Sequence, residues 1–418
     1  MGTGMITVEP RTADRLAALA ETVETELREH ILPFWLGLRD SARGGFAGAA
    51  TSRGRALPSA PKGAVLHARI LWVFSAAYLR FSDPTLLSAA EFAYRFITEY
   101  LVDPVAGGVF WTASADGAPA DRRKHLYAQA FAIYGLVAFH RASGECEALD
   151  LAQQIWRVIE RAAVDPRGAG YFEAFSPDWR IASNELMGRT EAPKTFNTHF
   201  HLFEAYGALW GIWPDPALRR RLEMLTALLT GPLLDRRRNT FQQFFEADWR
   251  NLDEGFSNGH DIEASWLIPA VADRLAPELA DAARAAVYGV ADAVLDRAVE
   301  ADGGVVNGLG PDGGLDHGKD WWVQAEALVG FLDAFERQHE MRFLSAAEDV
   351  WGFIERSVID RAGGEWRWRI APAGVAQPVL PKASIWKCPY HNGRACLEVL
   401  DRAARLAVHV RAPAGRDP

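Results

Sequence analysis

Hydrophobic and polar positions along the chain divide its helical segments into two kinds. Segments such as 88–101, 151–162 and 346–359 carry apolar residues at i, i+3, i+4 and i+7 with charged residues between them, the pattern of a helix with one buried face. Six other segments are apolar around most of their circumference, at 67–79, 125–139, 197–210, 259–271, 320–332 and 386–400. Such helices are expected to be buried. The chain is therefore expected to be all-α, with outer and inner helices in alternation.

A short turn motif recurs six times, each time between an outer segment and the inner segment that follows it. Each copy combines an acidic residue, a glycine pair or its equivalent, and a short aromatic or β-branched stretch, in the sequences DSARGGFAG, DPVAGGVFW, DPRGAGYFEAF, DRRRNTFQQFF, ADGGVVNG and DRAGGEWRW. The copies are about 60 to 70 residues apart, the length of a helix hairpin with its loops. Six hairpins predict an (α/α)6 barrel of six outer and six inner helices, with short β-hairpins or strands in the loops at one mouth. The alternative is an open helical solenoid, which needs polar caps at both ends.

No linker rich in Pro, Gly or Ser divides the chain. We therefore expect one barrel domain over residues 13–408, a flexible N-terminus at 1–12 and a flexible tail at 409–418. The first residues lack the apolar stretch of a secretory signal, and the apolar run around Arg69 is interrupted by that charge and too short to span a bilayer. The protein is expected to be cytoplasmic, with no membrane partner.

Composition narrows the classes of partner. A net charge of -9 at pH 7 argues against nucleic acid, because phosphate binding needs clustered Lys and Arg. Cys146, Cys388 and Cys396 form no C-x-x-C pair, so we expect neither a disulfide framework nor a zinc–cysteine site. The 15 Trp and 22 Phe are many for this length, so aromatic rings are available to line a small-molecule site.

Polar residues of the inner segments crowd into their first turns. In a closed barrel, parallel inner helices place their N-termini at one mouth, so these side chains are expected to converge on one funnel. Aromatic faces beside Asn, Gln and Glu suit a sugar particularly well. The converging residues are Arg69, Lys124, Tyr127, Gln129, Asn197, His199, His201, His260, Glu263, Trp321, Trp322, Glu326, Trp386 and His391.

Three of these histidines indicate chemistry. His201, His260 and His391 lie on the third, fourth and sixth inner segments. Glu204 and Glu263 follow the first two at i+3, where a carboxylate can accept the imidazole N–H and fix the tautomer. The remaining histidines on outer segments or at helix ends are expected to be solvated, and His199 is expected to be structural.

Three reactions could use such a funnel. Three imidazoles could bind Zn²⁺, although no His pair has the i, i+4 spacing of a metalloprotease helix. Glycoside hydrolysis needs two carboxyls, for which Asp261, Glu263 and Glu326 are candidates, but it leaves the histidines without a role. Proton transfer at carbon suits histidine, whose ordinary pKa is near neutral, and two such bases on opposite faces of one carbon define an epimerase. We therefore expect neither a metal nor a cofactor.

The chain resembles the N-acylglucosamine 2-epimerase superfamily, and within it the cellobiose 2-epimerases most. The segments that carry the resemblance are KGAVLHARILWVFSAAY, RKHLYAQAFAIYGL, NTHFHLFEAY, GHDIEASWL, WWVQAEALVGF, GGEW and WKCPYHNGRACLE, which span residues 62–398. The resemblance implies an (α/α)6 barrel and reversible inversion of C2 in the reducing-end glucose of β-1,4-linked disaccharides, through ring opening and a cis-enediolate. Some members also interconvert aldose and ketose.

The resemblance also implies roles for individual residues. The paired acid/base histidines fall on His260 and His391, the supporting histidine on His201, and an arginine near the sugar oxygens on Arg69. The residues expected to bind the sugar are Tyr127, Asn197, Glu263, Trp322, Glu326, Trp386, His67 and Asn258, of which the two tryptophans stack on sugar rings.

Three residues depart from the family pattern. His67 stands where an Asn is usual, Asn258 where an aromatic is usual, and Asn307 where an acid is usual. These changes near the mouth predict that glucose or mannose is epimerised at a rate comparable with cellobiose. Rival interpretations are an aldose–ketose isomerase, a glycoside hydrolase and a non-catalytic binding protein. The protein is expected to be a monomer or a homodimer.

Overall fold

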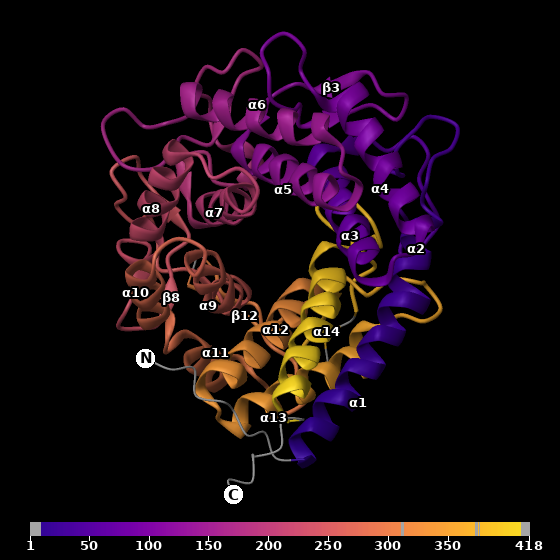
Figure 1. The fold of residues 1–418 in the computed structure, drawn as a ribbon, viewed down its shortest axis with the longest axis vertical. Helices are drawn as coiled ribbons and strands as arrows, with labels where there is room; N and C mark the ends of the chain where they lie inside the picture. Colours follow the sequence, from indigo (N-terminus) through magenta and orange to yellow (C-terminus); the bar gives the residue numbers. More distant parts are fainter. Residues whose placement is uncertain (1–9, 311–312, 373–374, 376, 411–418) are drawn as a thin grey trace, which may run out of the picture.

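Six inner helices form a closed ring in the computed structural model, which describes residues 10–310, 313–372, 375 and 377–410 (Figure 1). They are α3 (Ala64–Phe81), α5 (Leu126–Ser143), α7 (Phe196–Trp210), α9 (Asn258–Ala272), α12 (Trp321–Gln338) and α14 (Tyr390–Val410). Each inner helix contacts the next one along the chain, and α14 contacts α3. The ring is therefore closed, which confirms the predicted (α/α)6 barrel over the open solenoid.

The outer helices pack against this ring as amphipathic elements. They are α1 (Pro10–Glu26), α4 (Pro84–Phe96), α6 (Cys146–Ala162), α8 (Pro216–Thr230), α10 (Pro277–Val287) with α11 (Val290–Ala298), and α13 (Met341–Phe353). The side chains of Asp83 and Asp215 accept the N–H of Thr85 and Ala217 and so cap α4 and α8 before a proline at the first helical position. In the fifth hairpin the outer layer is shared by two helices, α10 and α11, where a single one was expected.

Irregular helical turns extend several of these elements. Wider π-helical turns follow α1, α4 and α13 at Leu27–Ile31, Ile97–Leu101 and Ile354–Val358. The short α2 (Leu32–Leu36) continues the first of them, and one 3₁₀ turn, Glu185–Met187, lies in the loop before α7.

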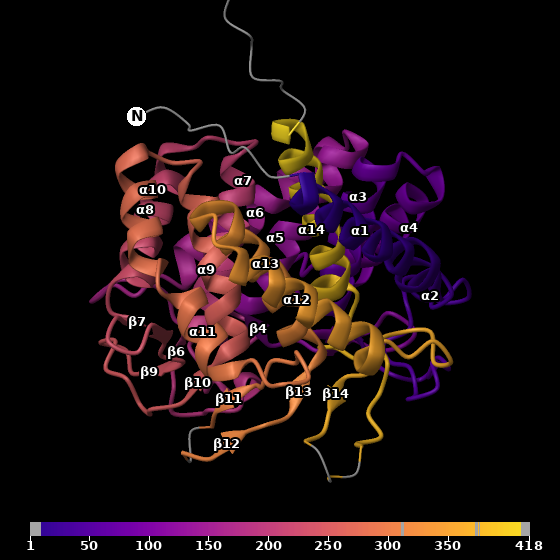
Figure 2. The same ribbon diagram turned by 90° about the horizontal axis from the view of Figure 1, so that it is seen from below.

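The strands are short and gather at one mouth of the barrel, as predicted (Figure 2). They pair in small antiparallel sheets. Two sheets have three strands: β1 (Lys62–Gly63), β2 (Thr112–Ala113) and β3 (Pro119–Asp121) form one, and β10 (Phe256–Ser257), β11 (Gly308–Leu309) and β12 (Leu315–Asp316) form the other. The two-stranded sheets are β4 (Lys124–His125) with β5 (Ala174–Phe175), β6 (Lys194–Thr195) with β9 (Phe244–Phe245), β7 (Leu234–Asp235) with β8 (Thr240–Phe241), and β13 (Lys319–Asp320) with β14 (Arg369–Ile370). Five of these strands, β1, β4, β6, β10 and β13, run directly into an inner helix. The N-termini of these inner helices therefore open at the mouth that the strands surround.

The recurring turn motif is tied to the helix that follows it by ion pairs in which the lysine is buried. In five of the six copies a lysine ahead of the inner helix bonds the aspartate of the turn, as Lys62–Asp40, Lys124–Asp103, Lys194–Asp165, Lys319–Asp302 and Lys382–Asp360, at 2.6 to 2.9 Å. The fourth copy differs. There, Arg297 of α11 bonds Asn258 at 2.8 Å and Asp261 at 2.5 Å, so a different cation holds the start of α9.

A second contact explains the small residues of the motif. The fourth residue of five inner helices accepts the N–H of the turn, as His67 from Phe46, Gln129 from Val109, His199 from Tyr171, Asp261 from Phe241 and Gln324 from Val305. Gly45 has φ +64°, and a Cβ there would lie 2.8 Å from Nε2 of His67. Glycine is required because both the backbone angle and the close approach exclude a side chain.

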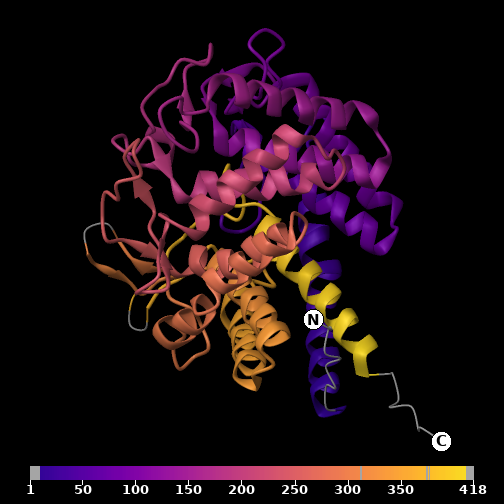
Figure 3. The same cartoon turned by 60° about the vertical axis from the view of Figure 1, so that its left-hand side comes forward.

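The first and last helices complete the barrel together. α1 lies beside α14 and contacts it (Figure 3). Most of the predicted flexible ends, residues 1–9 and 411–418, lie outside the described residues, but residues 10–12 belong to α1 and 409–410 to α14. Among the described helices, α3 is long and apolar enough to cross a membrane, but 67% of it is buried inside the protein, as befits an inner helix.

Candidate active site

A cavity of about 250 Å³ lies at the strand-bearing mouth, where the inner helices begin. It is lined by Arg69, Tyr127, Asn197, His201, His260, Glu263, Asp320, Trp321, Trp322, Trp368, Trp386 and His391. The structure thus brings together ten of the residues that the sequence nominated. Asp320 and Trp368 were not nominated; their signal was their place just before an inner helix and within the aromatic stretch of the sixth turn.

His260 and His391 both lie beside one indole. Their ring centroids are 5.0 and 5.6 Å from that of Trp322. Nδ1 of His260 lies 2.7 Å from Oε1 of Gln243. Because an amide oxygen only accepts, Nδ1 carries the proton and Nε2 is left as the basic nitrogen. This corrects the expectation that Glu263 would hold His260.

The other two histidines are held by carboxylates. Nδ1 of His391 lies 2.6 Å from Oε1 of Glu326, and Nδ1 of His201 lies 2.8 Å from Oε2 of Glu204, as the i+3 spacing predicted. Glu326 was expected to bind the sugar. It does not line the cavity, and its place behind His391 makes it a positioning residue instead.

Arg394 was missed by the sequence reasoning. It lies one turn after His391 on α14 and is 1% exposed. Nη1 donates to Oε1 of Glu204 at 2.7 Å and to the Tyr390 hydroxyl at 2.6 Å, while Nη2 donates to Oε1 of Glu263 and, at 2.7 Å, to Oε1 of Glu326. The sequence indicated it only as the one arginine within the inner segment 386–400, which is expected to be buried.

The same guanidinium bears on the question of a metal. Donor atoms of Glu263, Glu326 and His391 lie within 4.8 Å of one another, a spacing that a cation could bridge. Arg394 already donates to both carboxylates, and Nδ1 of His391 is engaged by Glu326. The cation of this cluster is therefore the guanidinium.

Burial sets the protonation of these groups. It lowers the pKa of His260 to about 3 and, together with Arg69 and Arg394, lowers the pKa of His391 well below its usual value. Both imidazoles are therefore neutral near pH 7 and able to accept a proton. Burial opposes ionisation of Glu204, but Arg394, His201 and Tyr390 together lower its pKa to about 2.

Arg69 and Asn197 leave polar atoms free for a ligand. Arg69 donates from Nη2 to the Tyr127 hydroxyl at 2.6 Å, and its guanidinium lies 4.0 Å from the Phe131 ring centroid. Nε of Arg69 and Oδ1 of Asn197 are buried and have no hydrogen-bond partner among the described residues. Since buried polar atoms are normally bonded, both are suited to hold a polar molecule in the cavity.

Two predicted sugar-binding residues lie elsewhere. His67 is 0% exposed, accepts the N–H of Phe46 at 3.0 Å and bonds the carbonyl of Gly63 at 2.9 Å. Asn258 donates to the carbonyl of Val306 at 2.9 Å and accepts from Arg297. Neither lines the cavity. The structure places both side chains away from the predicted sugar contact, because the first and fourth positions of these helices face the strand-bearing loops.

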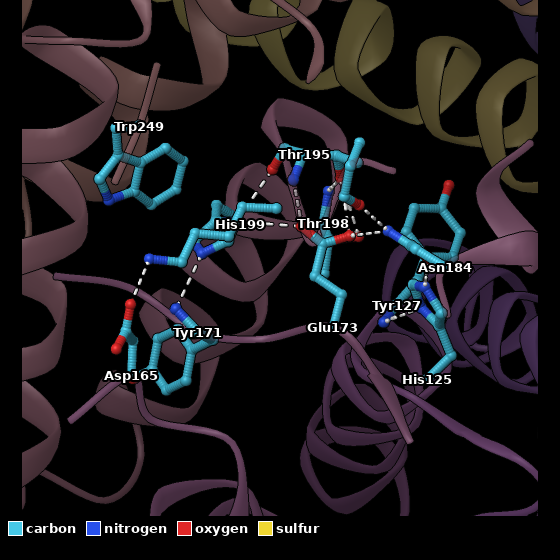
Figure 4. A network of polar contacts seen from close by, with 12 residues as sticks. His125, Tyr127, Asp165, Tyr171, Glu173, Asn184, Thr195, Thr198, His199 and Trp249 are labelled. Carbon is cyan, nitrogen blue, oxygen red and sulfur yellow. Dashed lines mark hydrogen bonds and ion pairs between the residues drawn. The ribbon is translucent and has the colours of Figure 1, made fainter. Parts of the chain in front are cut away.

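His199 has the structural role expected of it. Figure 4 shows its ring between the N–H of Tyr171, which donates to Nε2 at 3.0 Å, and the carbonyl of Thr195, 2.9 Å from Nδ1. Nearby, Asn184 joins His125 to Glu173 and so fixes the loop before α7 (Figure 4).

Replacing His67 by glutamine is expected to leave catalytic activity unchanged and to alter the free energy of unfolding by less than about 1 kcal/mol. Gln129 and Gln324 occupy the same fourth position and accept the same backbone N–H. Urea denaturation and steady-state kinetics check this. A large fall in activity with unchanged stability would indicate that His67 takes part in sugar binding.

Comparisons with known proteins give the family of this chain. The model of the N-acylglucosamine 2-epimerase (GlcNAc 2-epimerase) family matches residues 44–392. A cellobiose 2-epimerase of Bacteroides fragilis is 38% identical over 386 residues, 91% of this chain and 98% of its own. The solved structure of cellobiose 2-epimerase from Spirochaeta thermophila has a TM-score of 0.86 at 40% identity and covers 94% of this chain and 98% of its own.

A more distant relative is a D-mannose isomerase of Pseudomonas cannabina pv. alisalensis, 26% identical over 420 residues, 89% of this chain and 94% of its own. The family match and the nearer relatives each extend over most of the chain. This protein is a carbohydrate epimerase of the isomerase class, and its chain belongs to the N-acylglucosamine 2-epimerase family.

Proposed function

We propose that this protein inverts C2 of the reducing-end aldose of a cellobiose-type disaccharide, with His260 and His391 as the two proton-transfer groups. The observation that carries the proposal is their geometry. Each ring is held through Nδ1, by Gln243 and Glu326, and both rings lie beside Trp322 in one cavity. Two neutral bases in one cavity suit abstraction from one face of a carbon and delivery to the other.

The cycle begins with opening of the sugar ring, in which His391 carries a proton between the anomeric hydroxyl and the ring oxygen. One histidine then takes the proton from C2. The C–H electron pair forms the C1–C2 double bond, and the carbonyl pair moves to O1 as a cis-enediolate, which Arg69 stabilises. The intermediate turns, the first histidine releases the C2 proton to solvent, and the other histidine takes a proton from solvent and delivers it to the opposite face of C2. The two histidines exchange roles in the reverse direction.

The disaccharide is favoured over a free monosaccharide by the corrected positions of two residues. The argument for comparable monosaccharide turnover rested on His67, Asn258 and Asn307. His67 and Asn258 lie outside the cavity, and Asn307 donates to Asp316 at 2.9 Å in the β10–β12 sheet. Trp386 remains on the cavity wall, packed against Trp111 with centroids 5.5 Å apart, and its indole offers a face for a second sugar ring.

The deciding experiment is NMR of cellobiose, glucose and mannose incubated with the protein in D2O. The expected result is a C2 epimer of cellobiose that has gained deuterium at C2, formed with a higher kcat/KM than either monosaccharide shows. A ketose product would favour the aldose–ketose isomerase, because the same enediolate protonated at C1 gives a ketose. Cleavage of the disaccharide would establish a hydrolase, and no change in any sugar would favour a binding protein.

Activity is expected to survive exhaustive dialysis against EDTA, because Arg394 supplies the positive charge of the carboxylate cluster. The measurement is kcat before and after chelation. A loss that added Zn²⁺ or Mn²⁺ restores would show that a metal takes part in catalysis.

A further inference from the structure

The buried part of the site holds three carboxyls and two guanidiniums. Glu204, Glu263 and Glu326 lie around Arg394, and the second guanidinium, that of Arg69, lies near Glu263. All five side chains are at most 4% exposed. With every carboxyl ionised, these five side chains together carry a net charge of -1. Burying an uncompensated charge is costly, and one bound proton would make the set neutral.

The surroundings of Glu263 come from all the inner helices. The titratable and charged groups that face it are His201 and Glu204 of α7, Glu326 of α12, Tyr390, His391 and Arg394 of α14, Arg69 of α3, Tyr127 of α5 and His260 of its own helix α9.

Two unpartnered oxygens show where that proton can bind. Oε2 of Glu263 and Oε2 of Glu326 are buried and have no hydrogen-bond partner among the described residues, whereas both Oε1 atoms accept from Arg394. Glu204 differs, because both of its oxygens are bonded, to His201 and to Arg394 with Tyr390. A carboxylate with both oxygens satisfied is stable as the anion. The proton therefore belongs to the Glu263–Glu326 pair.

We propose that Glu263 and Glu326 share one proton, and that Glu263 in its neutral acid form donates a hydrogen bond from Oε2 to the sugar oxygen that becomes negative. Glu263 lines the cavity and Glu326 does not. Glu326 accepts from Nδ1 of His391, which favours its ionised form. The identity of the ligand oxygen rests on the proposed function.

The charge of the intermediate supports the neutral form. When C2 loses its proton, the carbonyl electron pair moves to O1, and an ionised Glu263 beside that oxygen would repel it. A neutral acid donates to O1 without giving up its proton, so no further acid is needed.

The pH dependence has a defined sign. Burial and the charge of Glu326 raise the pKa of Glu263 to about 7. The donor form is complete below that pH and is lost as the pH rises through it. Because the two carboxyls are coupled, the titration belongs to the pair.

The protonation itself is measured by infrared difference spectroscopy on the full chain. Wild type minus Glu263→Gln is expected to show the C=O stretch of a protonated carboxyl below pH 7 and to lose it above pH 7. Asp333→Asn is the matched control, because Asp333 is a buried carboxylate of α12 that pairs with Arg402 of α14, as Glu326 of α12 pairs with Arg394 of α14. The Asp333→Asn variant is expected to keep the band of the protonated carboxyl. The absence of such a band in wild type would overturn the proposal, whether or not any sugar is epimerised.

Kinetics give the second readout. In wild type, kcat/KM for cellobiose is expected to fall above about pH 7, whereas Glu263→Gln is expected to be about tenfold slower below pH 7 and flat across it, since an amide N–H donates at every pH. Glu263→Ala, which has no donor, is expected to lose 10²-fold or more. An unchanged alkaline fall in the glutamine variant would overturn the role of Glu263. An infrared band in a protein that epimerises no aldose would refute the proposed function and leave the shared proton standing.

Discussion

Replacing His260 or His391 by alanine is expected to lower kcat for C2 epimerisation by about 10²- to 10⁴-fold, equivalent to about 3 to 5 kcal/mol in the barrier. Each ring is held through Nδ1, which leaves Nε2 available to a substrate in the cavity that both rings line. Removing either ring therefore leaves one face of C2 without a proton-transfer group. Epimer formation and deuterium uptake at C2 are measured together, because a variant that keeps one base can still exchange the proton on one face.

The matched control is His67→Gln, which changes another buried imidazole near the start of an inner helix but outside the cavity. Circular dichroism and urea denaturation establish that the alanine variants fold. If either alanine variant epimerised cellobiose at near wild-type rates, the two-histidine assignment would be wrong.

Helical periodicity and the six repeats predicted the barrel, because a helix that is apolar all round is expected to be buried. The contact of α14 with α3 was needed to exclude the open solenoid. The same periodicity contains a rule that would have sorted the site residues. Several cavity-lining residues, Tyr127, Asn197, His201 and Glu263 among them, stand at the second or sixth position of their helix, whereas the fourth position faces the turn motif. Residues two apart on a helix point about 200° apart. His67 is a fourth residue and Arg69 a sixth, so the family pattern alone misplaced one of the two.

Hydrogen-bond partners could not be predicted in the same way. His201–Glu204 and His260–Glu263 share the i+3 spacing, but only the first pair forms. Glu263 is drawn away by Arg394, which lies 131 residues later, and His260 is held by Gln243 from the neighbouring loop. A local spacing states which contact is possible. The choice between a local and a distant partner depends on packing that one helix does not contain.

Arg394→Met is expected to destabilise the protein by about 3 to 5 kcal/mol at neutral pH, because three glutamates lose the one guanidinium that bonds all of them. The difference from wild type has a definite pH dependence. Arg394 helps to lower the pKa of Glu204 from its ordinary 4.5 to about 2, so this stabilisation is present above about pH 4.5 and is lost as the pH falls through 2. The variant should therefore approach wild-type stability in acid. It should also lose activity, since Glu326 and Glu204 orient His391 and His201.

Arg402→Met is the matched control: Arg402 lies two turns further along α14, is 5% exposed and bonds Asp333 and Glu336 away from the cavity. It is expected to lose stability without losing kcat. Equal losses of kcat in the two variants would show that Arg394 acts only through the fold, and an Arg394 variant with wild-type stability at neutral pH would show that the glutamates are neutral without it.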